Sequence, residues 1–401
     1  MSNQELIQRS QKVFINTYGR YPVAMVAGKG CRLTDADGQE YLDFVSGIAV
    51  CSLGHCHPGV TEAICAQAAK LVHVSNLYHT EPQTKLAELL VENSFADRVF
   101  MCNSGAEANE AAIKLARKHG GADRYEIISL EGSFHGRTLA TVAATGQSKF
   151  HKGFEPLPTG FKHAPFGDIE ALEKMINPQT CGILCEPLQG EGGVRPLAKE
   201  YLAAIRALCD KHNLLLIFDE VQVGMGRTGS LFAYEQLGVT PDIITIAKAL
   251  GNGLPIGAML TTETIAASFA PGDHASTFGG NPIGCAAALV VMETLLADGF
   301  LAGIKTRGEY LAAQLQRMAA KYPKIAKNVR GTGLIQGLVL TDEAIPHGGD
   351  LVMRLFNKGL LLNFAGNVAL RCIPPLVVSN SEIDEMINLV DETFSELSST
   401  I

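Results

Sequence analysis

The chain lacks the features that mark several classes of protein. It has no block of lysine and arginine residues and no apolar stretch approaching the length of a membrane helix, and its net charge is −8. These absences argue against nucleic-acid binding and against a membrane span. Residues 1–10 lack the apolar core of a signal peptide, so the ten cysteines have no secretory context. We expect them to be reduced in a cytoplasmic protein, and because their spacing matches no zinc site we expect no metal.

The residues that are present describe a compact globular protein. The 401 residues are 47% apolar and 18% charged. Between about residues 61 and 292, candidate strands that are apolar on both faces alternate with candidate helices, which predicts an α/β fold with a mostly parallel central sheet. After about residue 298, two amphipathic helices flank strand-like runs. We therefore expect a large domain (59–297) and a smaller α+β domain (298–401) joined by the N-terminal segment (1–58).

Lys248 is the most informative residue. It follows the apolar run 243–246 and precedes a glycine-rich turn, and Asp219 follows a second apolar run, 214–218. A lysine and a carboxylate at two strand ends are what an enzyme needs to hold pyridoxal phosphate. The lysine binds the cofactor covalently, and the carboxylate keeps its pyridine nitrogen protonated. Each residue alone is more often a surface residue, so further parts of such a site must be found.

A phosphate site is indicated after the candidate strand 98–102. Ser104, Gly105 and Ala106 form a tight turn that opens an alanine-rich helix, where backbone N–H groups and the helix dipole favour an anion. Ser104 adds a hydroxyl donor. An ordinary helix cap by Ser104 explains the same residues equally well.

Two more strand ends carry residues suited to the ring and to a substrate. Phe134 can stack on a flat ring and Arg137 can bind a carboxylate in a bidentate manner. After Asp219 and Glu220, Val221 suits the underside of the ring and Gln222 its phenolic oxygen. Burial of Phe134 in the core and a surface ion pair of Arg137 remain alternatives.

Carboxylate recognition is indicated at two places. Glu191 lies in a glycine loop after the candidate strand 182–185, and Arg371 lies in the C-terminal domain. Amino acids and dicarboxylic 2-oxo acids both suit bidentate arginine. By contrast, Gly224, Gly226 and Gly229 match the G-x-G-x-x-G dinucleotide pattern but do not lead directly from strand to helix, so NAD binding stays a remote alternative.

Together these motifs resemble the class III (ornithine-type) aminotransferases, pyridoxal phosphate enzymes of fold type I. The quoted segments are 47–50, 53–58, 103–109, 134–137, 218–222, 247–248, 276–282 and 371–376. The resemblance implies that Lys248 carries the cofactor and Asp219 pairs with the pyridinium nitrogen. Gly105 and Ala106 are expected to bind the phosphate, while the ring lies between Phe134 and Val221.

The resemblance also implies a homodimer and two substrates. Thr277 would reach the phosphate of the neighbouring subunit's cofactor, with Ser276 near the substrate. Arg137 would bind the α-carboxylate of the amino donor, and Arg371 that of glutamate or 2-oxoglutarate, with Glu191 masking Arg371 in alternation.

Within this family the resemblance favours N2-acetyl-L-ornithine as donor. Tyr18 falls where some members place a tyrosine that contacts free ornithine, whereas Ile48 stands where those members carry an aromatic residue. Other ω-amino donors (succinylornithine, ornithine or 4-aminobutyrate), an aminomutase and a catalytically inactive regulator remain alternatives.

Overall fold

The structure is a computed structural model and describes residues 1–398. A seven-stranded sheet forms its centre, with strand order β4-β12-β11-β10-β7-β5-β6. The strands are β4 (Arg98–Cys102), β5 (Glu126–Leu130), β6 (Phe161–Ala164), β7 (Thr180–Cys185), β10 (Leu215–Asp219), β11 (Ile243–Ile246) and β12 (Gly257–Thr261). All neighbouring pairs are parallel except those of β12, which runs antiparallel to β11 and to β4. The predicted α/β fold with a mostly parallel central sheet is confirmed, with one reversed strand.

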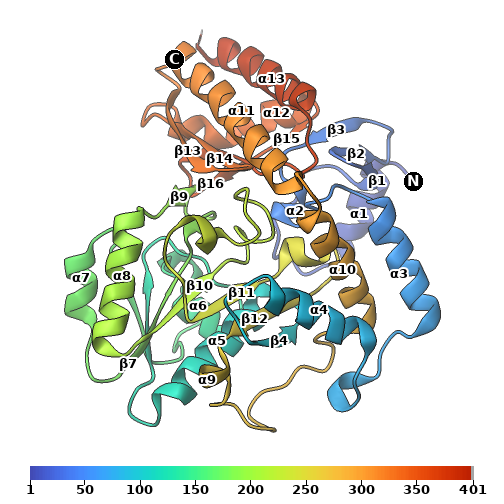
Figure 1. Cartoon of the computed structure of the whole chain (residues 1–401). Helices are drawn as coiled ribbons and strands as arrows, with labels where there is room; N and C mark the ends of the chain where they lie inside the picture. Colours follow the sequence, from blue (N-terminus) through green and yellow to red (C-terminus); the bar gives the residue numbers. More distant parts are fainter. Residues whose placement is uncertain (399–401) are drawn as a thin grey trace.

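Helices cover both faces of this sheet, because successive residues in its strands are apolar (Figure 1). In β10, Leu215 and Ile217 belong to the core cluster that includes α5, whereas Leu216 and Phe218 belong to the larger cluster on the opposite face. This burial on both sides is the usual environment of a parallel sheet. The helices of this part are α3 (Pro58–Lys70), α4 (Glu81–Glu92), α5 (Gly105–Gly120), α6 (Leu139–Ala144), α7 (Ile169–Met175), α8 (Lys199–His212), α9 (Glu263–Ala266) and α10 (Pro282–Leu296).

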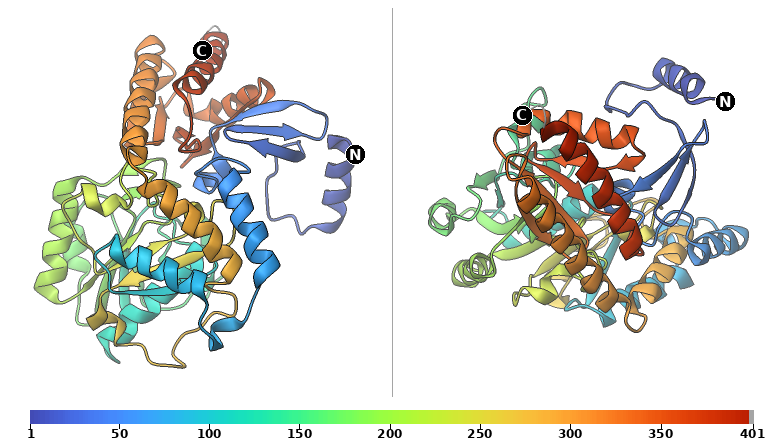
Figure 2. Two further views of the ribbon diagram at one scale, coloured as in Figure 1. Left: turned by 45° about the vertical axis from the view of Figure 1, so that its right-hand side comes forward. Right: turned by 90° about the horizontal axis from the view of Figure 1, so that it is seen from above.

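The C-terminal part forms a second layer of helices on an antiparallel sheet with strand order β13-β14-β17-β16. Its strands are β13 (Ala326–Thr332), β14 (Ile335–Leu340), β16 (Asn363–Ala365) and β17 (Ala369–Cys372), and its helices are α11 (Phe300–Lys321), α12 (Gly348–Asn357) and α13 (Asn380–Ser398). In Figure 2 these helices stand above the larger part of the molecule, beside the N-terminal strands. Within residues 1–398 no single helix has the length and composition of a membrane span. Only α10 and α11 taken together do, with a 74° bend between them.

The N-terminal strands join this C-terminal part. Strands β1 (Met25–Lys29), β2 (Arg32–Asp35) and β3 (Glu40–Asp43) form a sheet to which β15 (Leu360–Leu361) adds in parallel to β3. Arg32 in β2 also forms a bidentate pair with Glu385 in α13, with a distance of 2.9 Å from Nη1 to Oε1. Helix α1 (Asn3–Val13) begins at a capping box on Ser2. The division at residues 58 and 297 stays a prediction.

A left-handed turn follows β3. Ser46, Gly47, Ile48 and Ala49 (α2) have φ values of 47°, 65°, 65° and 60°. Left-handed backbone is a genuine outlier for a β-branched residue such as Ile48, and such strain persists only where the surroundings hold it. Here the Asp43 carboxylate accepts hydrogen bonds from the N–H groups of residues 45 and 46. The Ser46 hydroxyl donates to the carbonyl of residue 373.

Candidate active site

A cavity of about 410 Å³ opens where several strands of the central sheet end. Its lining comes from the segments after β4, β5, β7, β10 and β11, because the carboxyl ends of parallel strands meet at one edge of a sheet. The predicted site residues in this lining are Ser104, Gly105, Ala106, Phe134, Arg137, Glu191, Asp219, Val221, Gln222 and Lys248. The tertiary structure therefore brings together ten residues that are spread over 145 positions, from 104 to 248.

Lys248 lies two residues after the end of β11 and begins a short 3₁₀ turn (Lys248–Gly251). Its φ of 47° places this non-glycine residue in left-handed backbone, a strained conformation typical of functional sites. Burial lowers the pKa of its amine, although the nearby carboxylates of Glu191 and Asp219 oppose the effect. A lysine with a lowered pKa has more of its amine in the neutral form, which is the form that attacks a carbonyl carbon.

Asp219 ends β10 and is held by two side chains that are also buried. Its Oδ2 atom accepts hydrogen bonds from Asn109 Nδ2 at 2.7 Å and from His135 Nδ1 at 2.8 Å, and its Oδ1 from the N–H of Val221 at 3.0 Å. Asn109 in turn accepts from the Thr245 hydroxyl at 2.7 Å. These donors fix the orientation of the Asp219 carboxylate toward the cavity.

The N-terminus of α5 has the geometry expected of a phosphate site. Ser104 is the N-cap, and its Oγ atom accepts from the N–H of Glu107 at 3.2 Å, so the predicted cap is present; its hydroxyl proton stays free to donate. Among residues 1–398, no partner is found for the N–H groups of Gly105 and Ala106. Gly105 packs so closely on Val221 that a Cβ atom would lie 2.5 Å from Cγ1 of that valine. The absence of a side chain therefore keeps this anion-binding turn close to Val221.

The loop after β5 places an aromatic ring and an arginine together. The guanidinium of Arg137 lies 5.4 Å from the ring centroid of Phe134 and 4.1 Å from that of Phe150. Glu186, at the end of β7, accepts a hydrogen bond from the N–H of Phe134 at 2.8 Å. Burial, with the neighbouring Asp219 charge, raises the pKa of Glu186 well above its usual range.

Arg371 is almost completely buried, at 1% exposure, and pairs with Glu191. The distance from Arg371 Nη1 to Glu191 Oε1 is 2.6 Å, and the same nitrogen donates to Gln222 Oε1 at 3.0 Å. Its Nε atom donates to Asn363. Although burial favours the neutral acid, the charge of Arg371 and its hydrogen bond hold the pKa of Glu191 below its usual range. Glu191 occupies the Nη1 donor of Arg371, so any other carboxylate that binds this atom must first displace Glu191.

Five predicted site residues do not line this cavity: Arg371, which reaches it only through Glu191 and Gln222, and four that lie elsewhere in the single chain. Tyr18 is 69% exposed and lines a separate N-terminal cavity. Thr277 and Ser276 line a neighbouring surface cavity, and the Ser276 hydroxyl accepts from Asn103 Nδ2. Glu220 turns away and accepts hydrogen bonds from the N–H groups of residues 233 and 234, and burial raises its pKa to about 8.

The glycine pattern at 224–229 packs against protein. A Cβ atom on Gly226 would lie 2.8 Å from Leu295 Cδ2, and one on Gly224 would lie 2.9 Å from the carbonyl oxygen of Glu220. Turns, not a helix, run from residue 221 to 228. The strand–turn–helix unit that a dinucleotide requires is therefore absent from this described segment.

The sequence did not single out three residues that contact the site: Asn109, His135 and Glu186. The first two lie within motifs that drew attention for other reasons, three and one residue from Ala106 and Phe134 respectively. In the sequence, each of these three residues is a polar side chain close to the end of a candidate strand. Many surface residues share this feature, so it does not single them out.

Known proteins resemble this chain over its whole length. The family profile described as aminotransferase class-III matches residues 14–394. An acetylornithine aminotransferase from Caldanaerobacter subterraneus subsp. tengcongensis is 50% identical, covering 98% of this chain and 100% of that protein. The ornithine aminotransferase from Toxoplasma gondii has a TM-score of 0.95 at 32% identity, covering 100% of this chain and 97% of that one. The N-acetylornithine aminotransferase from Stenotrophomonas maltophilia has a TM-score of 0.84 at 36% identity, covering 98% and 100%.

Proposed function

Because the chain belongs to the class-III aminotransferases, which use pyridoxal phosphate, we propose that it transfers the δ-amino group of N2-acetyl-L-ornithine to 2-oxoglutarate. The products are N-acetyl-L-glutamate 5-semialdehyde and L-glutamate, a reaction of arginine biosynthesis. The chain is 50% identical, over nearly its full length, to relatives that are named for this activity. The observation that carries the proposal is one cavity lined by Lys248, Asp219 and Glu191, in which the Glu191 carboxylate pairs with the buried Arg371.

The residues fit pyridoxal phosphate. Gly105 and Ala106 offer unpartnered N–H groups at a helix N-terminus to the phosphate, and a side chain at position 105 would collide with Val221. Asp219, oriented by two hydrogen bonds on one oxygen, would pair with the pyridinium nitrogen. Phe134 and Val221 would lie on the two faces of the ring. When bound, the cofactor supplies an electron sink for the bond that breaks at the carbon bearing the amine.

Lys248 would supply the proton transfers. Its amine would bind the cofactor covalently, and once a donor amine displaces it, Nζ can take the proton from the δ-carbon of that donor. A lowered pKa suits this role, because a general base must be unprotonated before it acts. The neighbouring carboxylates of Asp219 and Glu191 help to hold the proton while it resides on Nζ.

Two substrates with different ends must use the same cavity in turn, and the Arg371–Glu191 pair would allow this alternation. While Arg371 is paired with Glu191, its positive charge is neutralised and it does not attract a substrate carboxylate. Arg137 would then bind the α-carboxylate of the acylated ornithine. Glutamate and 2-oxoglutarate bring a carboxylate that can replace Glu191 on Arg371, which has the donor geometry for bidentate binding. The kinetics are therefore expected to be ping-pong.

The active unit would be a homodimer. Thr277 does not line the cavity of its own chain, and neither does Ser276, whereas both would contribute to the neighbouring subunit's site. The Asn76 side chain donates to the carbonyl of Ser276, and the residues that follow these two segments expose large apolar side chains: Leu77 at 83%, Tyr78 at 67% and Phe278 at 61%. Such a patch is typical of a protein interface. Gel filtration tests the dimer, and Thr277→Ala is expected to weaken cofactor retention; a fully active monomer would contradict it.

A cytoplasmic location is part of the proposal. All ten cysteines, none of which falls in residues 399–401, are free thiols in the structure. Free thiols suit a reducing compartment.

The decisive experiment compares Lys248→Ala with the surface change Lys152→Ala. The first variant is expected to lose the visible absorbance of the bound cofactor and all transaminase activity, while the second keeps both. Rates with N-acetylornithine, N-succinylornithine, ornithine and 4-aminobutyrate then identify the donor. An active Lys248→Ala variant would refute the pyridoxal phosphate mechanism, and a clear preference for free ornithine would refute the acetylated donor alone.

A further inference from the structure

We propose that Arg227 is a positioning residue for Arg371, holding the carboxylate-binding strand against the loop that follows Asp219. This inference rests on the proposed function, because it assigns a role in binding glutamate and 2-oxoglutarate. Arg227 belongs to the glycine-rich segment 224–229, whose glycines pack against protein atoms. Its side chain points into the protein and is 1% exposed.

The guanidinium of Arg227 binds the ends of the two strands that matter for Arg371. Its Nη1 atom donates to the carbonyl of Leu334 at 2.9 Å and to the carbonyl of Pro374 at 2.5 Å. Leu334 directly precedes β14, and Pro374 lies two residues after β17 ends. Arg371 is in β17 and pairs in register with Gly337 of β14. In this antiparallel register Leu334 and Pro374 lie at the same end of the two strands, so one nitrogen joins β14 and β17 just beyond Arg371.

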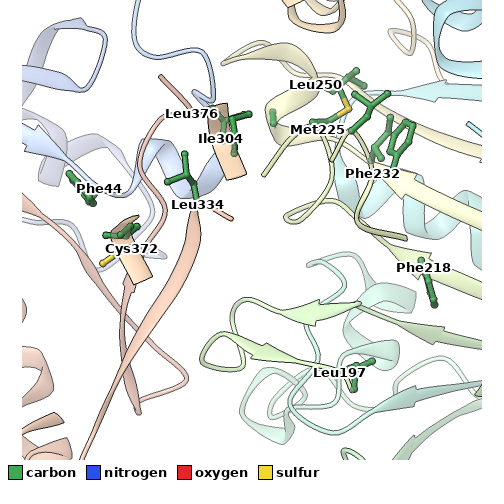
Figure 3. Packing of buried hydrophobic residues seen from close by; sticks show 14 of the residues in the cluster. Phe44, Leu197, Phe218, Met225, Phe232, Leu250, Ile304, Leu334, Cys372 and Leu376 are labelled. Carbon is green, nitrogen blue, oxygen red and sulfur yellow. The ribbon is translucent and has the colours of Figure 1, made fainter. Parts of the chain in front are cut away.

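Close backbone packing reinforces this connection. The carbonyl of Arg227 accepts a hydrogen bond from the N–H of Leu334 at 3.0 Å. A Cβ atom on Gly333 would lie 2.6 Å from that same carbonyl oxygen, so the two loops touch without room for a side chain. Figure 3 shows Leu334 beside Ile304 and Leu376 in the core, and both of these lie within 3.5 Å of a Cβ built on Gly226. Residues 226–228 therefore pack between the start of β14 and helix α11.

The charge of Arg227 is unusual for a purely structural contact. No carboxylate lies within ion-pair distance of it among residues 1–398, and its third acceptor is the Ser52 hydroxyl at 3.3 Å. Burial lowers the pKa of Arg227 to about 9, with Asp43 opposing this effect. An isolated buried charge is costly, and replacing it by an apolar side chain can stabilise a protein. A buried arginine at position 227 is explained if its rigid, planar guanidinium is needed to hold the carbonyls of Leu334 and Pro374 in place relative to the loop after Asp219.

The consequence for catalysis is specific to one substrate. From Arg227 the chain runs back through Gln222, which accepts a hydrogen bond from Arg371, to Asp219. Gln222 therefore connects this loop to Arg371 itself, and Arg227 connects the same loop to the ends of β14 and β17. Loss of the Arg227 hydrogen bonds is expected to shift β17 and with it Arg371. Arg137, on a separate loop after β5, is expected to stay in place. Glutamate and 2-oxoglutarate depend on Arg371, and the acylated ornithine does not.

The test measures the two half-reactions of the holoenzyme separately, by the visible absorbance of the cofactor. Arg227→Met is expected to lower the second-order rate constant with glutamate roughly tenfold to a hundredfold, as for small misplacements of a binding group, and that with N-acetylornithine less than about threefold. Arg227→Lys keeps one donor and is expected to fall between. Arg307→Met is the matched control, because Arg307 also donates to one buried carbonyl, that of Leu376, but within residues 1–398 it makes no hydrogen bond to the 224–229 loop.

A double-mutant cycle tests whether Arg227 acts through Arg371. In an Arg371→Gln background, Arg227→Lys is expected to change the glutamate half-reaction less than about twofold, because the residue it positions is gone. Equal losses in both half-reactions, the same selectivity in Arg307→Met, or additive effects in the cycle would each overturn the proposal. If Arg227→Met does not fold, Arg227→Lys and the cycle decide the question. Should the donor prove not to be N-acetylornithine, the glutamate half-reaction still reports on Arg227, so the two failures are distinguishable.

Discussion

Replacement of His55 is expected to lower the free energy of unfolding at neutral pH and to remove much of its decrease as the pH rises toward 10. His55 Nε2 lies 2.6 Å from Asp43 Oδ2, with the histidine side chain 14% exposed and the carboxylate 1% exposed. Burial alone would lower the pKa of this imidazole, but the hydrogen bonds to Asp43 and Cys51 raise it to about 10. His55 is therefore charged in the folded protein at neutral pH.

The sign and size of the effect follow from these values. Because the folded state holds the proton more tightly than the unfolded chain, the stabilisation is complete below pH 6.5 and is lost as pH rises through 10. At ~1.4 kcal/mol for each pH unit between these values, the whole contribution is at most about 5 kcal/mol. Breaking a buried ion pair costs a similar 3–5 kcal/mol or so. We expect a loss of about 3 kcal/mol or more between pH 7 and pH 10.5.

The assay is urea unfolding of the wild type, His55→Gln and the control His119→Gln, an exposed histidine, at half-unit steps from pH 6 to pH 11. The free energy of unfolding of the wild type and the control should converge on that of His55→Gln above pH 10. Subtracting the variant removes contributions of other groups. Parallel curves for wild type and His55→Gln across this range would refute the ion pair. Because Asp43 also holds the N–H groups that open the left-handed turn 46–49, the variant should bind substrate less tightly as well.

Two further changes address the cavity directly. Glu191→Gln is expected to lower the KM for glutamate by several-fold and to raise that for N-acetylornithine, because Arg371 then stays available; unchanged KM values in steady-state assays would argue against masking. Gly105→Ala should place a Cβ atom 2.5 Å from Val221 Cγ1 and cost about 1–3 kcal/mol in cofactor affinity, measured by fluorescence titration of the apoprotein. Gly349→Ala is its control, since no atom lies within 4 Å of a Cβ built there, and an equal effect of both would show that packing at the phosphate turn is irrelevant.

Much of the catalytic part of the site could be predicted from local sequence. Lys248 and Asp219 each follow an apolar run, and runs that are apolar on both faces form parallel strands whose carboxyl ends meet at one edge. The same reasoning located the turn at Gly105, because a helix that opens after a strand must leave N–H groups unpaired. Hydrophobic periodicity and turn chemistry depend on residues that are close in the sequence, so the sequence alone indicates them.

The resemblance to known enzymes reached further, but it did not describe every contact. Strand β12 reads as one more apolar run, and nothing in its residues shows that it is antiparallel to its neighbours. Glu220 follows Asp219 directly and was expected at the cofactor, yet its carboxylate points the other way to two backbone N–H groups. Successive residues at a strand end point to opposite sides, and only the packing around them decides which side is the cavity.

What the sequence determined by itself is which residues are expected to carry the chemistry: Lys248, Asp219, the phosphate turn at Gly105 and the two arginines, Arg137 and Arg371. What only the tertiary structure decided is how they are held. Asn109 and His135 meet on one oxygen of Asp219 across 110 and 84 positions of the chain, and Arg371 meets Glu191 across 180. Arg227 resembles part of a nucleotide motif in the sequence and is a buried contact in the fold. The physical reason is that these partners are chosen by the packing of whole layers, whose geometry depends on every element between them.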